Sequence, residues 1–334
     1  MTDAAADVPA AMDAWRQTRY GGPEVVRMER MPVPVPGAAD VLLRVRATSV
    51  NSGDVKVMRG VPLLIRPASG LRHPRLATRG IDVAGTVASI GSEVTAYAVG
   101  DEVMGEIAGG ALAEYVVARA TLLTRRPDGL SAADAATLPV AGGTAWQALD
   151  SAGVTRGDRV LVIGASGGVG HFAVQLAAQR AAEVWALCGA RSARMVGDLG
   201  AVRTFDYRTT DAADLPHASF DAVVDIAGSF PLRALRRLVR PSGTLVLVSG
   251  EGGRVGGPIG RILRGILLSL TPGPRIRPVA AVPKPDVTRE LAALAATGGI
   301  RPVVERTFAF DEARAALAHV DAGHTVGKVV VDVP

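Results

Sequence analysis

The sequence is poor in cysteine and in aromatic residues. Its 334 residues include a single cysteine, Cys188, and aromatic side chains make up only 4% of the chain. One cysteine excludes a disulfide framework within the chain and a zinc site built on several cysteines, and it indicates a reducing compartment. The five histidines are scattered along the sequence, so no metal site is predicted.

Long apolar runs and a dense basic face are also lacking. No segment approaches the roughly 18 apolar residues of a membrane span, and the start, with Asp3 and Asp7, has no apolar signal-peptide core. Lys and Arg exceed Asp and Glu by 37 to 32, but the arginine-rich stretch 254–277 contains no aromatic residue to stack on bases. We therefore expect a cytoplasmic protein without nucleic-acid partners or stable membrane association.

Apolar and small residues are abundant instead. Hydrophobic residues account for 48% of the chain and glycine for 39 positions, which favours an α/β protein with a large core and many tight turns. Residues 1–13 are expected to form a flexible tail. Residues 14–134 predict a β-rich domain, because short β-branched runs alternate with turn signals there. The expected strands cover 41–50, 81–90, 102–106 and 114–117.

From residue 135 to residue 284 the pattern alternates between strands and helices. Such alternation predicts right-handed crossovers and a parallel sheet that is covered on both faces. The last segment, 285–334, is expected to return to the β-rich domain. The strands expected in these two segments are 159–163, 183–187, 222–225, 244–248, 303–308 and 328–332, and the helices are 168–180, 191–199, 231–239, 286–297 and 311–323.

The turn after the first strand of this alternating segment, 159–163, indicates a nucleotide site. Gly167 and Gly170 match the last two glycines of the dinucleotide fingerprint, and Ala165 stands at the position of the first. Such glycines let the backbone approach a pyrophosphate, and the following helix supplies N–H donors and a positive dipole end. The residues expected to bind cofactor here are Ala165, Ser166, Gly167, Gly168, Val169 and Gly170.

The same turn also fits a hydrolase pattern. Residues 164–168 satisfy G-x-S-x-G, the nucleophile elbow, and Asp225 with His319 or His324 would complete the order Ser, Asp, His. No HGGG-type oxyanion loop precedes the turn, and the chain upstream resembles a separate β-rich domain. A hydrolase with Ser166 as nucleophile is therefore the less favoured alternative.

The end of the second strand of the alternating segment, 183–187, favours NADPH over NADH. NAD sites place an acid there to bind the ribose hydroxyls, but residues 187–191 contain none, and Arg191 can bind a 2′-phosphate.

Short-chain reductases, which also bind NADPH, are excluded by a different motif. They need a Tyr-x-x-x-Lys pair, and none of the four tyrosines has a lysine four residues later.

In order and spacing, several short motifs resemble the medium-chain dehydrogenase/reductase superfamily, in particular its zinc-independent quinone oxidoreductase branch. The resemblance runs from about residue 14 to 333 and implies a GroES-like catalytic domain from both chain ends, a Rossmann domain between them and a homodimer. Zinc-dependent relatives bind zinc through a Cys near Ser52 and a His near Ile81, and this chain has neither. The motifs lie at 21–24, 50–54, 80–85, 99–103, 113–116, 143–149, 164–170 and 327–330.

The resemblance also implies roles for single residues. It places Asn51 and Thr144 beside the nicotinamide, and it assigns the 2′-phosphate to Tyr207 and the basic residue Arg191. Close relatives often have Ser and Asn where this chain has Gly189 and Ser192. The pair Ser249 and Gly250 follows a parallel strand at its carboxyl end, where ligands bind in such sheets.

Without zinc, the expected substrate is a quinone or an α,β-unsaturated carbonyl. Hydride addition to a carbon of such a substrate spreads charge into a hydroquinone or an enolate, so cofactor positioning and modest oxyanion stabilisation suffice. The expected catalytic residues are Asn51, beside the nicotinamide, and Lys56. Lys56 could hydrogen-bond the carbonyl oxygen of the substrate or supply a proton. An exposed loop lysine is the alternative interpretation of Lys56. Alcohol or ketone reduction with NADP and an NADPH-binding sensor with little turnover stay open as alternative functions.

Three further features have mainly structural interpretations. Asp54 is expected to close a turn, and His73 to lie on the surface. Apolar residues recur at helical spacing over 259–270, which predicts an amphipathic helix. We expect this helix to cover the substrate site or a dimer edge, with a membrane-surface anchor as the alternative.

Overall fold

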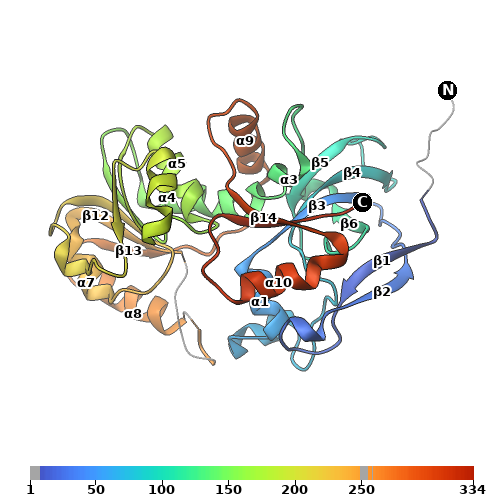
Figure 1. Ribbon diagram of the computed structural model, residues 1–334, viewed down its shortest axis with the longest axis horizontal. Coiled ribbons are helices and arrows are strands. Elements are labelled where there is room, and N and C mark those ends of the chain that lie inside the picture. Colours follow the sequence, from blue (N-terminus) through green and yellow to red (C-terminus); the bar gives the residue numbers. More distant parts are fainter. Residues whose placement is uncertain (1–7, 249–254, 258) are drawn as a thin grey trace. The chain divides into compact units, whose positions relative to one another are not determined.

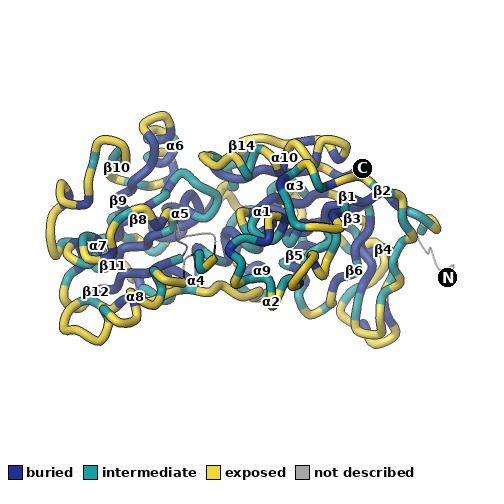
Figure 2. Tube along the Cα trace, turned by 90° about the horizontal axis from the view of Figure 1, so that it is seen from below, coloured by how far each residue is buried: buried dark blue, intermediate teal, exposed yellow. Residues whose placement is uncertain are grey.

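A computed structural model describes residues 8–248, 255–257 and 259–334 (Figure 1). The chain divides into two compact units. Unit 1 contains residues up to 61, 65–143 and 283–334, and unit 2 contains residues 62–64 and 144–282. Buried residues concentrate along the strands of both units (Figure 2).

Unit 1 is built on a seven-stranded sheet with the order β14-β15-β3-β4-β5-β7, in which β6 also pairs with β3. A separate antiparallel hairpin consists of β1 and β2. The strands of unit 1 are β1 (Ala11–Arg16), β2 (Arg27–Pro32), β3 (Asp40–Val50), β4 (Asp82–Ile90), β5 (Glu102–Glu106), β6 (Tyr115–Arg119), β7 (Leu123–Arg125), β14 (Val304–Ala309) and β15 (Lys328–Asp332). Its helices are α1 (Ser52–Arg59), α2 (Arg66–Ser69), α3 (Ala132–Ala135), α9 (Pro285–Ala296), α10 (Ala313–Asp321) and a π-helix, Leu138–Gly142.

Strand β3 organises unit 1, because it pairs antiparallel with β4, β6 and β15. Its apolar residues, among them Leu43 and Val45, are fully buried in a core that also receives β15 and α10 from the end of the chain. The two distant ends of the sequence therefore build one domain. This arrangement brings β15 beside the end of β3, where the polar site described below is formed.

Unit 2 is a six-stranded parallel sheet with helices between its strands. Its strand order is β10-β9-β8-β11-β12-β13, and all neighbouring pairs are parallel. Its strands are β8 (Arg159–Ile163), β9 (Glu183–Cys188), β10 (Arg203–Asp206), β11 (Phe220–Asp225), β12 (Val239–Leu247) and β13 (Arg275–Pro278). Its helices are α4 (Gly143–Ala152, from Thr144 on), α5 (Gly170–Gln179), α6 (Ala193–Asp198), α7 (Leu232–Leu238) and α8 (Ile259–Ser269).

This strand order is that of a doubly wound Rossmann sheet. Strands β8, β9 and β10 follow one another in one direction, and β11, β12 and β13 in the other. The order therefore reverses between β8 and β11, and ligands bind such sheets beyond the carboxyl ends of the strands at this point. The apolar run of β8 is 0–2% exposed from Val160 to Ile163, as expected for a strand covered on both faces. The predicted α/β fold is confirmed.

Local boundaries differ in several places from those expected. Strand β1 begins at Ala11, inside the segment that composition assigned to a tail. Lys56 lies within helix α1 and not on a loop. The two edge strands β10 and β13 were not predicted, and each is only four residues long.

Candidate functional site: a dinucleotide turn and a buried polar network

The turn between β8 and α5 has the backbone geometry of a nucleotide site. Gly164 adopts a φ of +83°, and the N–H groups of Gly164 and Ala165 both donate to the Leu187 carbonyl at the end of β9. A Cβ on Gly170 would lie 2.1 Å from the Gly164 carbonyl oxygen. Gly170 is therefore required by the close packing of helix against strand.

Gly167 differs from Gly170, because the packing of the protein around position 167 does not require a glycine there. A Cβ there would meet only the Gly164 carbonyl oxygen, at 3.5 Å, which is ordinary van der Waals contact. The residue is half-buried, and it lies just ahead of the N-terminus of the ten-residue helix α5. The bare backbone at this position fits the pyrophosphate of a dinucleotide, which needs close approach and N–H donors.

His171 supports the same turn and was not singled out in the sequence. It is fully buried, and its Nδ1 lies 3.0 Å from the Gly167 carbonyl oxygen, to which the Nδ1–H tautomer donates. The backbone N–H of His171 bonds to the same oxygen at 3.1 Å. Both bonds fix the orientation of the Gly167 peptide.

A basic and aromatic cluster lies at the carboxyl ends of β9 and β10, and it includes Arg191 and Tyr207, to which the resemblance assigns the 2′-phosphate. Arg191 is exposed just after β9, and Tyr207, 43% exposed, follows β10. The Tyr207 N–H donates to the Cys188 carbonyl, so the two strand ends lie side by side. Ser192 is buried, and its N–H donates to the Gly189 carbonyl.

Arg208 belongs to this cluster and was missed in the sequence. Its guanidinium lies over the Tyr207 ring, 4.7 Å from the centroid, and a Cβ on Gly189 would meet its Nη1 at 3.3 Å. Its side chain is 60% exposed. The signal in the sequence was its place directly after Tyr207, where a basic residue can reach the same anion.

The hydrolase alternative has no support in the described part of the chain. The carboxylate of Asp225 is fully buried and accepts bonds from Arg261 Nη2, at 2.5 Å, and from the Gly228 N–H. Burial raises the pKa of Asp225, and Arg261 opposes this rise. His319 belongs to unit 1 and bonds to Glu305 at 3.1 Å. The predicted cofactor residues Ser249 and Gly250 lie outside the described residues.

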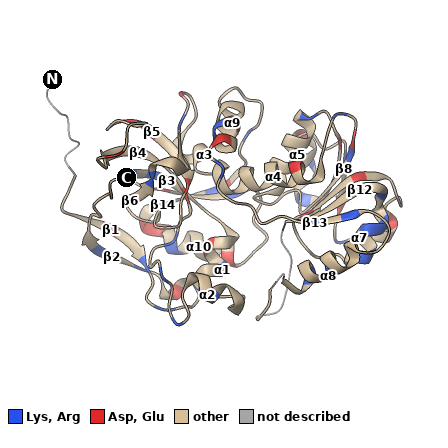
Figure 3. Cartoon of the chain, turned by 180° about the vertical axis from the view of Figure 1, so that it is seen from behind, with Lys and Arg blue, Asp and Glu red and all other residues tan. Residues whose placement is uncertain are grey.

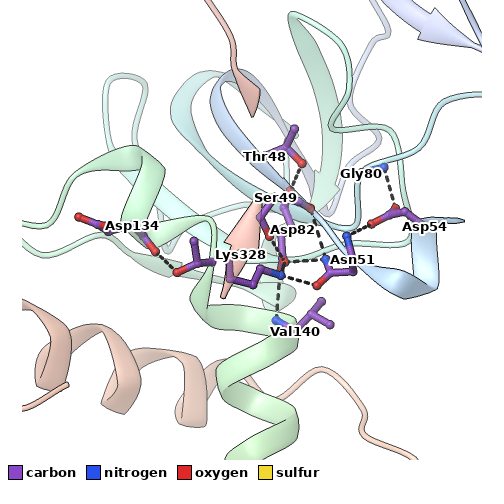
Figure 4. Close-up of polar contacts among 10 residues, drawn as sticks. Thr48, Ser49, Asn51, Asp54, Gly80, Asp82, Asp134, Val140 and Lys328 are labelled. Atoms are coloured by element: carbon purple, nitrogen blue, oxygen red, sulfur yellow. Dashed lines mark hydrogen bonds and ion pairs between the residues drawn. The ribbon is translucent and has the colours of Figure 1, made fainter. Parts of the chain in front are cut away.

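In unit 1 a buried polar network surrounds Asn51, at the junction of β3 and α1 (Figure 4). Lys328 Nζ, at the start of β15, donates to Asn51 Oδ1 at 2.5 Å. Asn51 Nδ2 donates to Asp82 Oδ2 at 2.8 Å, and the Ser49 hydroxyl donates to the same oxygen at 2.6 Å. The side chains of Lys328 and Asp82 are 3% and 0% exposed, respectively. Neither of them was assigned a role from the sequence.

Asp82 connects this network to the π-helix. Its Oδ1 accepts the backbone N–H of Val140 at 2.9 Å, and its backbone carbonyl accepts the Thr48 hydroxyl at 2.6 Å (Figure 4). Single π-helical turns are frequent at functional sites. This one leads into α4, on which the expected nicotinamide neighbour Thr144 is half-buried.

Asp54 has the structural role expected for it. Its carboxylate accepts the N–H groups of Asn51 and Gly80, at 3.0 and 2.9 Å, and so closes the first turn of α1 against the start of β4. Burial raises the pKa of Asp54, and both N–H bonds act in the opposite direction. The expected catalytic residue Lys56 lies on the same helix and is half-buried.

Glu106 is a second carboxyl group beside Asp82. The two residues are paired across strands β4 and β5 and therefore lie on the same face of the sheet. Burial raises the pKa of Glu106 to about 7, and the charge of Asp82 adds to the rise. The native protein therefore holds a proton on Glu106 at pH values where the unfolded chain, with a pKa near 4.5, has lost it.

We expect the free energy of unfolding to fall as the pH rises from about 4.5 to about 7, because the unfolded chain ionises Glu106 in this range while the native protein still holds the proton. Glu106→Gln should flatten this slope. At pH 8 it should stabilise the protein by about 1 to 2 kcal/mol, less than the full shift would give, because the group is partly exposed. Urea unfolding across pH measures this effect, with the exposed Glu290→Gln as control. An unchanged slope in Glu106→Gln would contradict it.

In the described ranges, no group of three or more His, Cys, Asp or Glu side chains could hold a metal ion. Among the same residues, no helix is long and apolar enough to cross a membrane.

Comparisons with known proteins agree with this architecture. Residues 37–128 match the alcohol dehydrogenase GroES-like domain, and residues 199–331 match the zinc-binding dehydrogenase family. The chain is 34% identical to a chloroplast envelope quinone oxidoreductase homolog of Arabidopsis thaliana, covering 96% of this chain and 98% of that protein. It is 30% identical to an NADPH-dependent alkenal/one oxidoreductase of the same plant, covering 98% and 81%.

A solved structure extends the likeness to three dimensions. The quinone oxidoreductase from Coxiella burnetii superposes with a TM-score of 0.85 at 28% identity, covering 97% of this chain and 100% of that one. Both the sequence and the fold thus match over almost the full length. The chain belongs to the medium-chain dehydrogenase/reductase superfamily, in its zinc-independent quinone oxidoreductase branch.

Proposed function

We propose that this protein is an NADPH-dependent reductase that transfers a hydride to quinones or α,β-unsaturated carbonyl compounds. The observation that carries the proposal is the bare backbone at Gly167, which the protein's own packing leaves free for a pyrophosphate. Relatives named for quinone and NADPH-dependent alkenal/one reduction support the substrate class and the cofactor.

The residues of unit 2 would bind the cofactor by its phosphates. The turn 165–170 and the N-terminus of α5 bind the pyrophosphate, and His171 keeps the Gly167 peptide in place. Arg191, Tyr207 and Arg208 bind the 2′-phosphate through charge-assisted hydrogen bonds. NADPH, when bound, supplies the hydride.

Asn51 and Lys56 of unit 1 and Thr144 of unit 2 would orient the reacting groups. Asn51 and Thr144 lie beside the nicotinamide, and Lys56 hydrogen-bonds the carbonyl oxygen of the substrate. That bond stabilises the negative charge that develops on oxygen when hydride is added to the conjugated carbon. The proton that completes the reduction comes from Lys56 or from water. We assign 14–134 and 285–334 to this catalytic domain and 135–284 to the cofactor domain.

Steady-state oxidation of NADPH and NADH with a panel of quinones and enones tests the proposal. We expect turnover with NADPH and a clear preference for it over NADH. Oxidation of secondary alcohols with NADP, without enone reduction, would favour an alcohol dehydrogenase instead. Tight NADPH binding without turnover on any member of the panel would favour a sensor.

The protein is also proposed to form a homodimer in the cytoplasm, through the exposed face of α8. Leu263, Ile266 and Leu267 on α8 are 45–64% exposed, and Leu270 just beyond it is 79% exposed. Gly265 faces inward, where a Cβ would meet Ile276 of β13 and Leu247 at 3.1 Å. The expected amphipathic helix is thus confirmed, with its apolar face on the surface of unit 2.

The edge strand β13 is poorly suited to pairing with another copy. Ser269 Oγ bonds both the N–H and the carbonyl of Ile276, the middle of β13, and Pro278 lacks an N–H. Several arginines lie on β13 and α7 (Figure 3). We therefore place the second copy on the apolar face of α8, where a continuous exposed patch indicates an interaction site.

Leu263→Glu with Leu267→Glu should convert the dimer to a monomer, because two carboxylates would be buried in the contact. Sedimentation velocity measures the change, and Val202→Glu, an exposed apolar residue in unit 2 and away from α8, is the control. A wild-type monomer would contradict the dimer, and its sedimentation with anionic vesicles would favour the membrane-surface alternative.

A further inference from the structure

We propose that Lys328 is a positioning residue for hydride transfer, because its ammonium group fixes the side-chain amide of Asn51 as a hydrogen-bond acceptor. This inference rests on the proposed place of Asn51 beside the nicotinamide. Lys328 is 3% exposed and contacts Asn51 from a strand 277 residues away in the sequence, so it acts through Asn51.

The hydrogen bonds around Asn51 leave one orientation of its amide. Oδ1 faces a group that can only donate, the ammonium of Lys328. Both N–H bonds of Nδ2 are used, one by Asp82 Oδ2 at 2.8 Å and one by the Ser49 carbonyl at 3.3 Å. The free capacity of the side chain is the second lone pair of Oδ1. Asn51 can therefore accept one further bond and donate none.

That remaining lone pair determines which kind of group Asn51 can bind. Its partner must be a donor, such as a carboxamide N–H or a ribose hydroxyl of the nicotinamide nucleoside. With Asn51 itself 8% exposed, this acceptor lies at the margin of the buried network. If the amide were turned over, it would present N–H groups to the same donors and repel them.

The charges around Lys328 keep this arrangement in place. Its Nζ lies 3.5 Å from Asp82 Oδ2, and Asp82 is anchored by Ser49 and by the Val140 N–H. Burial lowers the pKa of the Lys328 ammonium, and the carboxylates of Asp82 and Asp54 act in the opposite direction. Lys328 is thus the buried cation that balances the Asp82 carboxylate, while its hydrogen bond orients Asn51.

The test compares Lys328→Met, Lys328→Arg and Asn51→Ala, with the exposed Lys284→Met as control. In Lys328→Met and Asn51→Ala, the oriented acceptor of Asn51 is lost, which should lower kcat by about 10- to 100-fold. Kd for NADPH, which is dominated by contacts to the phosphates, should change by less than about threefold. Lys328→Arg should restore most of kcat. Because Lys328→Met leaves Asp82 without a counter-charge, the same measurements are made on the neutral pair K328M/D82N, provided that circular dichroism shows it folded.

A double-mutant cycle separates this role from a purely structural one. If Lys328 acts through Asn51, adding Lys328→Met to Asn51→Ala should lower kcat by no more than about twofold further. Full kcat in the folded K328M/D82N pair, or additive losses in the cycle, would overturn this inference but not the proposed function. Full kcat in Asn51→Ala would overturn both the inference and the proposed place of Asn51. Absence of NADPH oxidation by the wild type would overturn the proposed function itself.

Discussion

Gly167→Ala is expected to weaken cofactor binding severely and to leave the fold intact. The added methyl group meets only one carbonyl oxygen of the protein, at 3.5 Å, but it occupies the space through which a pyrophosphate approaches the backbone. Kd for both NADPH and NADH should rise by roughly 100-fold or more, a loss near 2.8 kcal/mol. Cofactor fluorescence measures Kd, and thermal unfolding should show a change in Tm below about 2 °C.

Two other glycines serve as controls for this result. Gly197 lies in α6 with nothing within 4 Å of an added Cβ, so Gly197→Ala should leave both Kd and Tm almost unchanged. Gly170→Ala forces a Cβ to 2.1 Å from a backbone oxygen and should destabilise the protein by about 3 kcal/mol. Normal NADPH binding by Gly167→Ala would show that the turn does not hold the pyrophosphate.

Removing the arginines at the ends of β9 and β10 should abolish the preference for NADPH. A charge-assisted hydrogen bond to phosphate contributes about 1.5 to 3 kcal/mol, so Arg191→Ala should raise Kd for NADPH by roughly 10- to 100-fold. Arg208→Ala should have a smaller effect, because its exposed guanidinium also lies over Tyr207. Neither change should alter Kd for NADH by more than about twofold.

The double variant R191A/R208A gives the clearest result. It should bind NADPH and NADH with similar affinity, and its NADPH binding should lose most of its salt dependence. Arg194→Ala, on the exposed side of α6, is the control. An equal loss of NADH affinity in the double variant would contradict a 2′-phosphate site in this cluster.

Elements with a strong local signal could be predicted from the sequence. The buried parallel strands β8 and β9 are continuous apolar runs, and the glycine spacing from 164 to 170 fixes a strand, a turn and a helix start. Strand β15 was expected at 328–332 and occurs at Lys328–Asp332.

Short edge strands could not be predicted in this way. Strands β10 and β13 contain the four-residue runs Arg-Thr-Phe-Asp and Arg-Ile-Arg-Pro, each at one edge of the sheet, and of these residues only Ile276 is buried. Charged residues and proline are common at edges because they discourage pairing with other chains, and they also remove the apolar signal. Pairing with β9 and β12 makes them strands.

The polar network around Asn51 could not be predicted from the sequence, for a different reason. Lys328 stands at the head of the apolar run Val329–Val331, and a lysine there is normally exposed. Its partners Asn51 and Asp82 are brought to it by the antiparallel pairing of β15 with β3 and of β3 with β4. Contacts at such separation depend on sheet register, which a single sequence does not specify.

Transfer of deuterium from NADPH labelled at the nicotinamide C4 tests the central claim most directly. The wild-type protein is mixed with labelled NADPH and an enone, and the product is analysed by nuclear magnetic resonance. The account predicts deuterium at the β-carbon of the saturated ketone and none at the carbonyl carbon. Deuterium at the carbonyl carbon, as in an alcohol, or unlabelled product with the NADPH unconsumed would contradict it.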